Sequence, residues 1–155
     1  MKQIIAIILA IGLSTAAGQE GNLQPYLEYS FAGTDIQAAA EEISDRIEAA
    51  GLMILGRYSP AGDPGKVVIA VTGDDLLAAV ASGSPTAGFA AALRVAITWQ
   101  DSQLVVSSQN PPYWANAYFQ SDYPAVAERI EAFAQSLDKA LSSDPPGGAT
   151  HCRTP

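Results

Sequence analysis

The chain has 155 residues, of which 16 are acidic and 8 are basic, so its formal net charge is −8. This length is enough for one domain with a sizeable hydrophobic core. The acidic balance opposes binding to nucleic acid, because the few basic residues are scattered and form no continuous stripe. We therefore expect no nucleic-acid partner.

Residues 1–18 have the order of a secretory signal. Lys2 precedes the uncharged, mostly large apolar run 4–13, and small residues follow that run. The run is too short to cross a bilayer, which takes about 20 residues, and no later stretch is long and apolar enough. The pattern predicts cleavage after Ala17 or Gly18 and a periplasmic or secreted mature protein without a membrane span. A buried amphipathic helix is the weaker alternative, because no polar residue interrupts one face of the run.

Residues 26–31 alternate between apolar or aromatic and polar side chains, which predicts a first strand, at the edge of a sheet. A helix follows, with Thr34 as its expected N-cap and Gly51 as the glycine that ends it. Between them one apolar stripe recurs every three or four positions: Ile36, Ala40, Ile43 and Ile47. We expect this stripe to face the core.

The later elements are marked by turn residues and by changes of hydrophobic period. Asp101 and Ser102 predict a two-residue hairpin turn, and Pro124 lies early in a final helix that runs from about residue 121 to 141. The other expected elements are a strand at 52–58, a turn at 59–65, a strand at 66–72 buried on both faces, a short helix at 74–81 with Leu76, Leu77 and Val80 inward, and strands at 90–99 and 103–108.

These elements predict the α+β class, as a two-layer domain with a mixed, mostly antiparallel sheet and helices covering one face. We expect a single domain over residues 19–142. Two basic residues, Arg57 and Arg94, fall inside predicted strands. A charge on a strand needs a partner or water, so we expect each arginine to pair with a carboxylate on the covering helix, and binding of an anionic ligand is the alternative.

Three hydrophobic segments stand in a familiar order. Residues 49–55 read AAGLMIL between helix and strand, 67–71 read VVIAV before the short helix, and 93–97 read LRVAI before the hairpin. This order resembles the DUF302 family, small domains of unknown function, over residues 34–109 and towards residue 141. The resemblance implies an α+β fold with helices against a sheet, and pairing as a homodimer.

The chain departs from that family at two places where many members carry cysteines. Here residues 71–74 read VTGD and residues 90–93 read AAAL, without a cysteine. Thiol or metal chemistry at those positions is therefore not carried over. The resemblance also brings no catalytic residues with it.

The last thirteen residues, 143–155, contain the single His and the single Cys of the chain, His151 and Cys152. The residues before them are rich in Pro, Gly and Ser, which predicts a disordered tail. A metal site needs three or four ligands held in place, and two neighbours on such a tail do not provide one. We therefore expect no metal and no cofactor.

The segment 110–123 is unusual for a connection between two elements, because it holds five of the twelve aromatic residues of the chain. We expect a loop here, with three alternatives for its rings. They complete the core through a short helical turn, they form a subunit interface, or they line a pocket for a small apolar or aromatic ligand. The candidate ligand or interface residues are Tyr113, Trp114, Asn116, Tyr118 and Arg94.

The sequence contains no phosphate loop, no dinucleotide-binding glycine turn and no haem-attachment motif. Catalysis by a serine nucleophile lacks a base, since His151 lies in the tail. We therefore favour an exported, non-enzymatic domain that associates with itself or binds a partner or a small ligand through the aromatic segment. The alternative is a periplasmic hydrolase that uses a pair of carboxylates in a cleft beside Tyr113 and Asn116.

Overall fold

The structure is a computed structural model and describes residues 23–142. The predicted signal peptide (1–18) and the predicted tail (143–155), with His151 and Cys152, lie outside the described residues. The described part contains one five-stranded sheet with the strand order β1-β5-β4-β3-β2, and every neighbouring pair is antiparallel. The strands are β1 (Tyr26–Phe31), β2 (Met53–Tyr58), β3 (Lys66–Thr72), β4 (Leu93–Gln100) and β5 (Gln103–Gln109).

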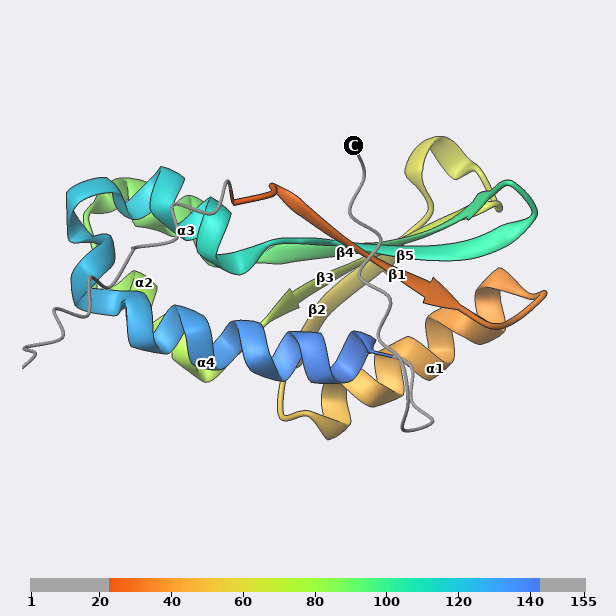
Figure 1. Cartoon of the computed structure of the whole chain (residues 1–155), viewed down its shortest axis with the longest axis horizontal. Helices are drawn as coiled ribbons and strands as arrows, with labels where there is room; N and C mark the ends of the chain where they lie inside the picture. Colours follow the sequence, from red (N-terminus) through yellow and green to blue (C-terminus); the bar gives the residue numbers. More distant parts are fainter. Residues whose placement is uncertain (1–22, 143–155) are drawn as a thin grey trace, which may run out of the picture.

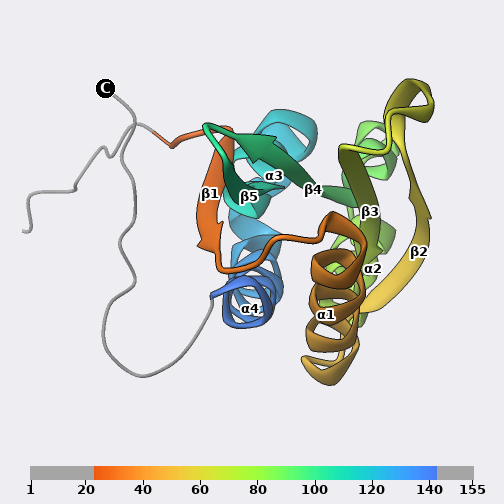
Figure 2. The same cartoon turned by 90° about the vertical axis from the view of Figure 1, so that its right-hand side faces the viewer.

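Four α-helices and three short 3-10 helices connect and cover the strands. Figure 1 shows α1 and α4 side by side along one face of the sheet, and Figure 2 shows that the opposite face carries no covering helix within the described residues. The α+β, two-layer architecture predicted from the sequence is confirmed, but the expectation of a mixed sheet was wrong, because all four strand pairs are antiparallel. The helices are α1 (Ile36–Ala49), α2 (Asp74–Ser82), α3 (Pro111–Phe119) and α4 (Tyr123–Leu141), with η1 (Pro60–Gly62), η2 (Pro85–Ala90) and η3 (Gln120–Asp122).

The core lies between the sheet and the two long helices. The apolar stripe of α1 is buried, and so is the stripe of α4, as the spacing predicts. On the sheet, alternate residues of each strand face this core. The largest core side chains come from both layers: Phe119, Phe133, Ile43, Ile47, Ile69, Ile97, Leu104, Ile130 and Leu137.

The two ends of α1 differ in how well the sequence predicts them. Asp35, not Thr34, is the N-cap, and its carboxylate accepts hydrogen bonds from the backbone N–H groups of Gln37 and Ala38 at 2.7 and 3.1 Å. The expected N-cap was therefore one residue early. The C-terminal prediction is confirmed: Gly51 has φ +79°, the conformation that glycine adopts at no steric cost.

The middle of the sheet follows the hydrophobic pattern. Five of the seven residues of β3 are buried, including Val68 and Thr72 on the side away from the helices, so the predicted burial of both faces of this interior strand is confirmed. Asp101 and Ser102 both have positive φ and join β4 to β5 in a tight turn, as expected. On α2, Leu76 is buried but Leu77 is 41% exposed, so the expectation that both face the core was wrong for Leu77.

The segment 110–123 is helical instead of a loop. It forms α3, the single turn η3 and the first residue of α4. Pro111 and Pro112 occupy the first turn of α3, where a missing N–H costs nothing because those donors have no partner inside a helix. Of the three alternatives for the rings of this segment, the structure supports completion of the core for Phe119, which is 1% exposed.

Arg57 lies on the edge strand β2, after a bulge between Ile54 and Gly56. Its side chain is exposed and makes no salt bridge within residues 23–142. The expected pairing with a helix carboxylate was therefore wrong for this residue. An edge strand leaves the arginine hydrated, so burial does not demand a partner.

Candidate functional site

The site begins with the two faces of α3. Pro111, Ala115 and Phe119 are spaced by four residues and are buried, so they fix the helix against the core. Trp114 and Tyr118 are also four residues apart and lie on the neighbouring face of the helix. This register keeps both rings partly buried, packed against the edge of the core, with one side towards solvent.

Five aromatic rings are in continuous contact at this end of the sheet, and we call them the aromatic cluster. Trp114 is its centre: its ring stacks on Tyr118 at 6.0 Å between centroids and meets Tyr113 edge-on at 5.5 Å and Tyr26 edge-on at 6.2 Å. Phe89 extends the cluster from Tyr118 at 5.8 Å. Such spacings and edge-on angles are those that aromatic pairs prefer, and each pair adds about 0.5–1.5 kcal/mol beyond burial.

Hydrogen bonds hold the three chain segments of the cluster together. The indole Nε1 of Trp114 donates to the carbonyl oxygen of Pro25 at 3.0 Å, which ties α3 to the start of β1. The Asn110 side chain donates to the carbonyl of Gln24 at 2.7 Å, beside the same contact. The Thr86 hydroxyl donates to the carbonyl of Tyr118 at 3.0 Å, which ties η2 to α3.

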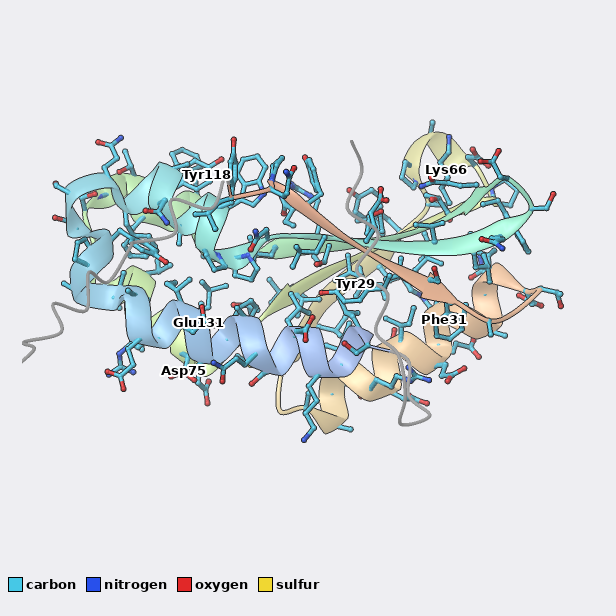
Figure 3. The ribbon with its side chains drawn as sticks, in the orientation of Figure 1. Tyr29, Phe31, Lys66, Asp75, Tyr118 and Glu131 are labelled. Carbon is cyan, nitrogen blue, oxygen red and sulfur yellow. The ribbon has the colours of Figure 1, made fainter. Side chains whose placement is uncertain are left out.

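The two ends of the cluster are open to solvent. Phe89 is 73% exposed and Tyr26 is 53% exposed, whereas Tyr113, Trp114 and Tyr118 are half-buried. Figure 3 shows the Tyr118 ring on the outer surface at the α3 end of the molecule. None of the five members is charged, so the cluster offers ring faces, ring edges and hydroxyl tips.

The structure brings three of the five predicted site residues together: Tyr113, Trp114 and Tyr118. Asn116 points away from Trp114 and Tyr118, each two positions from it on the helix, although Tyr113, three positions away, lies on its side of α3. The Asn116 amide donates to the carbonyl of Pro112 within α3, at 2.8 Å. Asn116 therefore supports the helix backbone and is not part of the cluster.

Arg94 lies on β4, on the sheet face opposite the helices, where its cross-strand neighbour is Ala70. The side chain is exposed and makes no salt bridge within the described residues, so the expected pairing with a helix carboxylate was wrong. The reason is the alternation along β4: Leu93 and Val95 face the helices and the residue between them faces away. The Arg94 backbone N–H donates to the Gln109 side chain at 2.8 Å.

Sequence reasoning missed two members of the cluster, Tyr26 and Phe89. Tyr26 was assigned only to an edge strand, and Phe89 stands alone among small residues of η2. A large ring in a run of Gly and Ala is a weak signal of a surface contact. No local pattern reports that residues 26, 89 and 114 meet in space.

A separate polar contact lies inside the domain, between β1 and α4. The Tyr29 hydroxyl donates to Asp138 Oδ1 at 3.0 Å. Burial, together with the charge of Asp138, raises the pKa of Tyr29 well above its usual value. The buried hydroxyl of Ser108 is near enough to oppose this pKa shift but has no hydrogen bond of good geometry. The contact links the edge strand β1 to α4.

Two absences within residues 23–142 bear on the kind of site that this part of the chain can form. No group of three or more His, Cys, Asp or Glu side chains is placed there to hold a metal ion. None of the helices in residues 23–142 is both long and apolar enough to cross a membrane.

Comparison with known proteins places the fold. No family model matches the sequence, and no curated protein matches it significantly. Among solved structures, the crystal structure of an uncharacterized conserved DUF302 protein from Bacillus stearothermophilus is similar, with a TM-score of 0.59, 14% sequence identity, and coverage of 75% of this chain and 93% of that chain. At this identity the likeness concerns the fold alone. The chain therefore has a DUF302-like fold.

Proposed function

We propose that this protein is an exported, non-catalytic binding domain whose contact surface is the aromatic cluster. The observation that carries the proposal is the exposure of Phe89 and Tyr26 at the two ends of one row of touching rings. Water contact with a large ring is unfavourable by about 25 cal/mol per Å² of apolar surface. A partner that covers these rings recovers that free energy.

The chemistry of the cluster indicates what it binds. Tyr and Trp are enriched at binding surfaces because they bury large areas with few rotatable bonds. The cluster has no charge of its own, so it favours an uncharged, apolar or aromatic group. The half-buried rings are held in place by the hydrogen bonds of Trp114 and Thr86, which lowers the entropy lost on binding.

The test is an NMR titration with indole and p-cresol as probes. We expect amide shifts confined to α3, η2 and the start of β1, and we expect Phe89→Ala to weaken them. Leu77→Ala is the matched control, because Leu77 is also an exposed apolar residue but lies on α2, outside the cluster. Shifts centred elsewhere, or equal in the Phe89→Ala variant and the wild type, would overturn the proposal.

The hydrolase alternative finds no support in a specific observation. Tyr113 and Asn116, the two residues expected at its cleft, are three positions apart and lie on one side of α3, but this proximity supplies no pair of carboxylates.

Export is the second part of the proposal and rests on the order of residues 1–18. N-terminal sequencing of the protein from its own cells tests it. We expect the mature chain to begin at Gly18 or Gln19. A soluble cytoplasmic product that still begins with Met1 would refute export without affecting the aromatic cluster.

A further inference from the structure

The aromatic cluster already holds one proline-containing segment of this chain, residues 23–25. The indole Nε1 of Trp114 donates to the carbonyl of Pro25 at 3.0 Å, and the backbone N–H of Asn110 donates to the same oxygen, also at 3.0 Å. The Asn110 side chain donates to the carbonyl of Gln24 at 2.7 Å. This contact therefore combines aromatic surface with donors that reach two consecutive backbone carbonyls beside a proline.

The other part of the cluster has the same two components, ring surface and hydrogen-bond donors. Phe89 is 73% exposed and contacts Tyr118, whose ring lies on the outer surface of the molecule (Figure 3). The hydroxyls of Tyr113 and Tyr118 donate to no acceptor within residues 23–142. The N–H of Trp114, in contrast, is already paired with Pro25. The two hydroxyls are therefore the donors that this part of the cluster can offer to carbonyls of another chain.

The angles between the rings favour a chain of small bulky groups over one flat ligand. Trp114 and Tyr118 are nearly parallel, at 23°, so each ring covers part of the other's face. Tyr26 and Tyr113 meet Trp114 at 66° and 76°. The rings thus form no common plane on which a flat sugar ring would stack. They present edges and parts of faces in succession, which suits the rings of successive prolines.

The length of the cluster matches a short extended peptide. From Phe89 through Tyr118 and Trp114 to Tyr26, successive ring centroids are 5.8, 6.0 and 6.2 Å apart. This path is at most about 18 Å long, and a polyproline II helix rises about 3.1 Å per residue, so about six residues cover it. That helix has no internal hydrogen bonds, so its carbonyls accept from outside donors.

We infer that the aromatic cluster binds a proline-rich segment of another protein in the polyproline II conformation. Its proline rings pack against Phe89, Tyr118 and Trp114, and its carbonyls accept hydrogen bonds from the hydroxyls of Tyr113 and Tyr118. Aromatic surfaces bind such segments well because the peptide is stiff before it binds and loses little entropy. An uncharged peptide is also not repelled by a chain of net charge −8. The inference rests on the proposed function, because it names the partner of the same surface.

The experiment is an NMR titration of the purified natural protein with acetylated octaproline amide. We expect saturable amide shifts in α3 and η2. A peptide of eight alternating Gly and Ser residues is the control, because it has the same number of backbone carbonyls but no proline rings and no stiffness. Cellohexaose tests a saccharide as the alternative occupant. We expect neither control compound to cause saturable shifts in these elements.

Tyr118→Phe separates the hydroxyl from the ring. Loss of one hydrogen bond corresponds to roughly a twofold to tenfold change in an equilibrium constant, so we expect the dissociation constant for octaproline to rise by that factor. The affinity for indole, which needs only the ring, should stay nearly unchanged. Tyr58→Phe is the matched control, because Tyr58 is also an exposed tyrosine, at 51%, but lies on β2 outside the cluster. It should leave octaproline binding unchanged.

Octaproline that causes no saturable shifts, while indole still binds, overturns this inference and leaves the proposed function intact. The inference is also overturned if the Gly-Ser peptide binds as tightly as octaproline, or if cellohexaose binds more tightly. A Tyr118→Phe variant with the same octaproline affinity as Tyr58→Phe would refute the assignment of the hydroxyl as a donor and with it the inference. Failure of both indole and octaproline to bind overturns the proposed function as well.

Discussion

Trp114→Ala is the substitution with the largest expected effect in the aromatic cluster. The ring is half-buried, packs on the core, and donates one hydrogen bond to the carbonyl of Pro25. A fully buried Trp→Ala change costs about 3–5 kcal/mol. Partial exposure reduces this burial cost to about 2 kcal/mol, and the lost hydrogen bond adds about 1 kcal/mol. We expect a total loss of about 3 kcal/mol in the free energy of unfolding.

Chemical denaturation with circular dichroism measures this loss. For a domain of this size, about 3 kcal/mol corresponds to a fall of roughly 10 °C in Tm. Trp114→Phe keeps a smaller aromatic ring and removes the N–H, so we expect a loss of about 1 kcal/mol from the hydrogen bond, well below the loss for Trp114→Ala. Phe89→Ala is the control from the same cluster: its ring is mostly exposed, so the loss should be under about 1 kcal/mol.

The outcome also separates a structural role from an interface role. If Trp114 acts within one chain, the loss is the same at about 1 μM and about 100 μM protein. A loss that grows with protein concentration would show that the ring is buried between subunits. A Trp114→Ala variant that costs no more than Phe89→Ala would refute the reasoning, because the half-buried ring would then contribute no more than the exposed one.

Three further predictions concern stability. The pKa of Tyr29 is raised in the fold, so the contribution of Tyr29 to the free energy of unfolding is complete below the ordinary tyrosine pKa of about 10 and is lost as the pH rises above that value. The urea midpoint should therefore fall less steeply between pH 8 and pH 11 for Tyr29→Phe than for the wild type. Gly83→Ala should cost about 1–3 kcal/mol because its new Cβ meets Phe119 at 2.9 Å, whereas Gly88→Ala, with nothing within 4 Å, should be nearly neutral by thermal denaturation. Asp35→Ala should cost about 1 kcal/mol and Thr34→Ala much less, and equal losses in urea denaturation would contradict the assignment of the N-cap.

Hydrophobic period was sufficient to predict most of the fold. The stripes of α1 and α4 have a pattern that a helix satisfies and a strand does not. The buried run of β3 is marked as a strand by its short length and its β-branched residues. The N-cap of α1 was misplaced because Thr34 and Asp35 are both good capping residues, and their order along the chain does not decide which side chain reaches the free N–H groups. The hydrophobic pattern predicts that a helix or strand exists better than it predicts the residues at which that helix or strand begins and ends.

The aromatic segment was harder because two local signals compete in it. Adjacent prolines at 111 and 112 are typical of loops, but they also suit the first turn of a helix. The buried positions of α3 are filled by Pro111, Ala115 and Phe119, a stripe with only one large apolar side chain. A stripe with so little apolar surface is too weak a pattern to predict a helix from the sequence. In the structure, Phe119 nevertheless anchors α3 in the core.

Membership of the aromatic cluster could be predicted only for the residues that one helix brings together. Tyr113, Trp114 and Tyr118 share α3, so their spacing reports their proximity. Tyr26 and Phe89 come from segments far away in the sequence, and the register that joins them depends on strand pairing and on the path of η2. Contacts of this kind follow from the complete fold and not from any local pattern.

The failed pairing of Arg94 shows how the aromatic cluster and the sheet face opposite the helices are related. Alternation on β4 places its side chain away from the helices, on the cross-strand row that also contains Gln109 and Tyr26. Tyr26 therefore belongs to the aromatic cluster and borders the sheet face opposite the helices at the same time. Phe89 lies at the other end of the cluster, beyond Tyr118 and Trp114. The two ends of the cluster thus have different surroundings: Tyr26 lies on the edge strand β1, and Phe89 lies on η2.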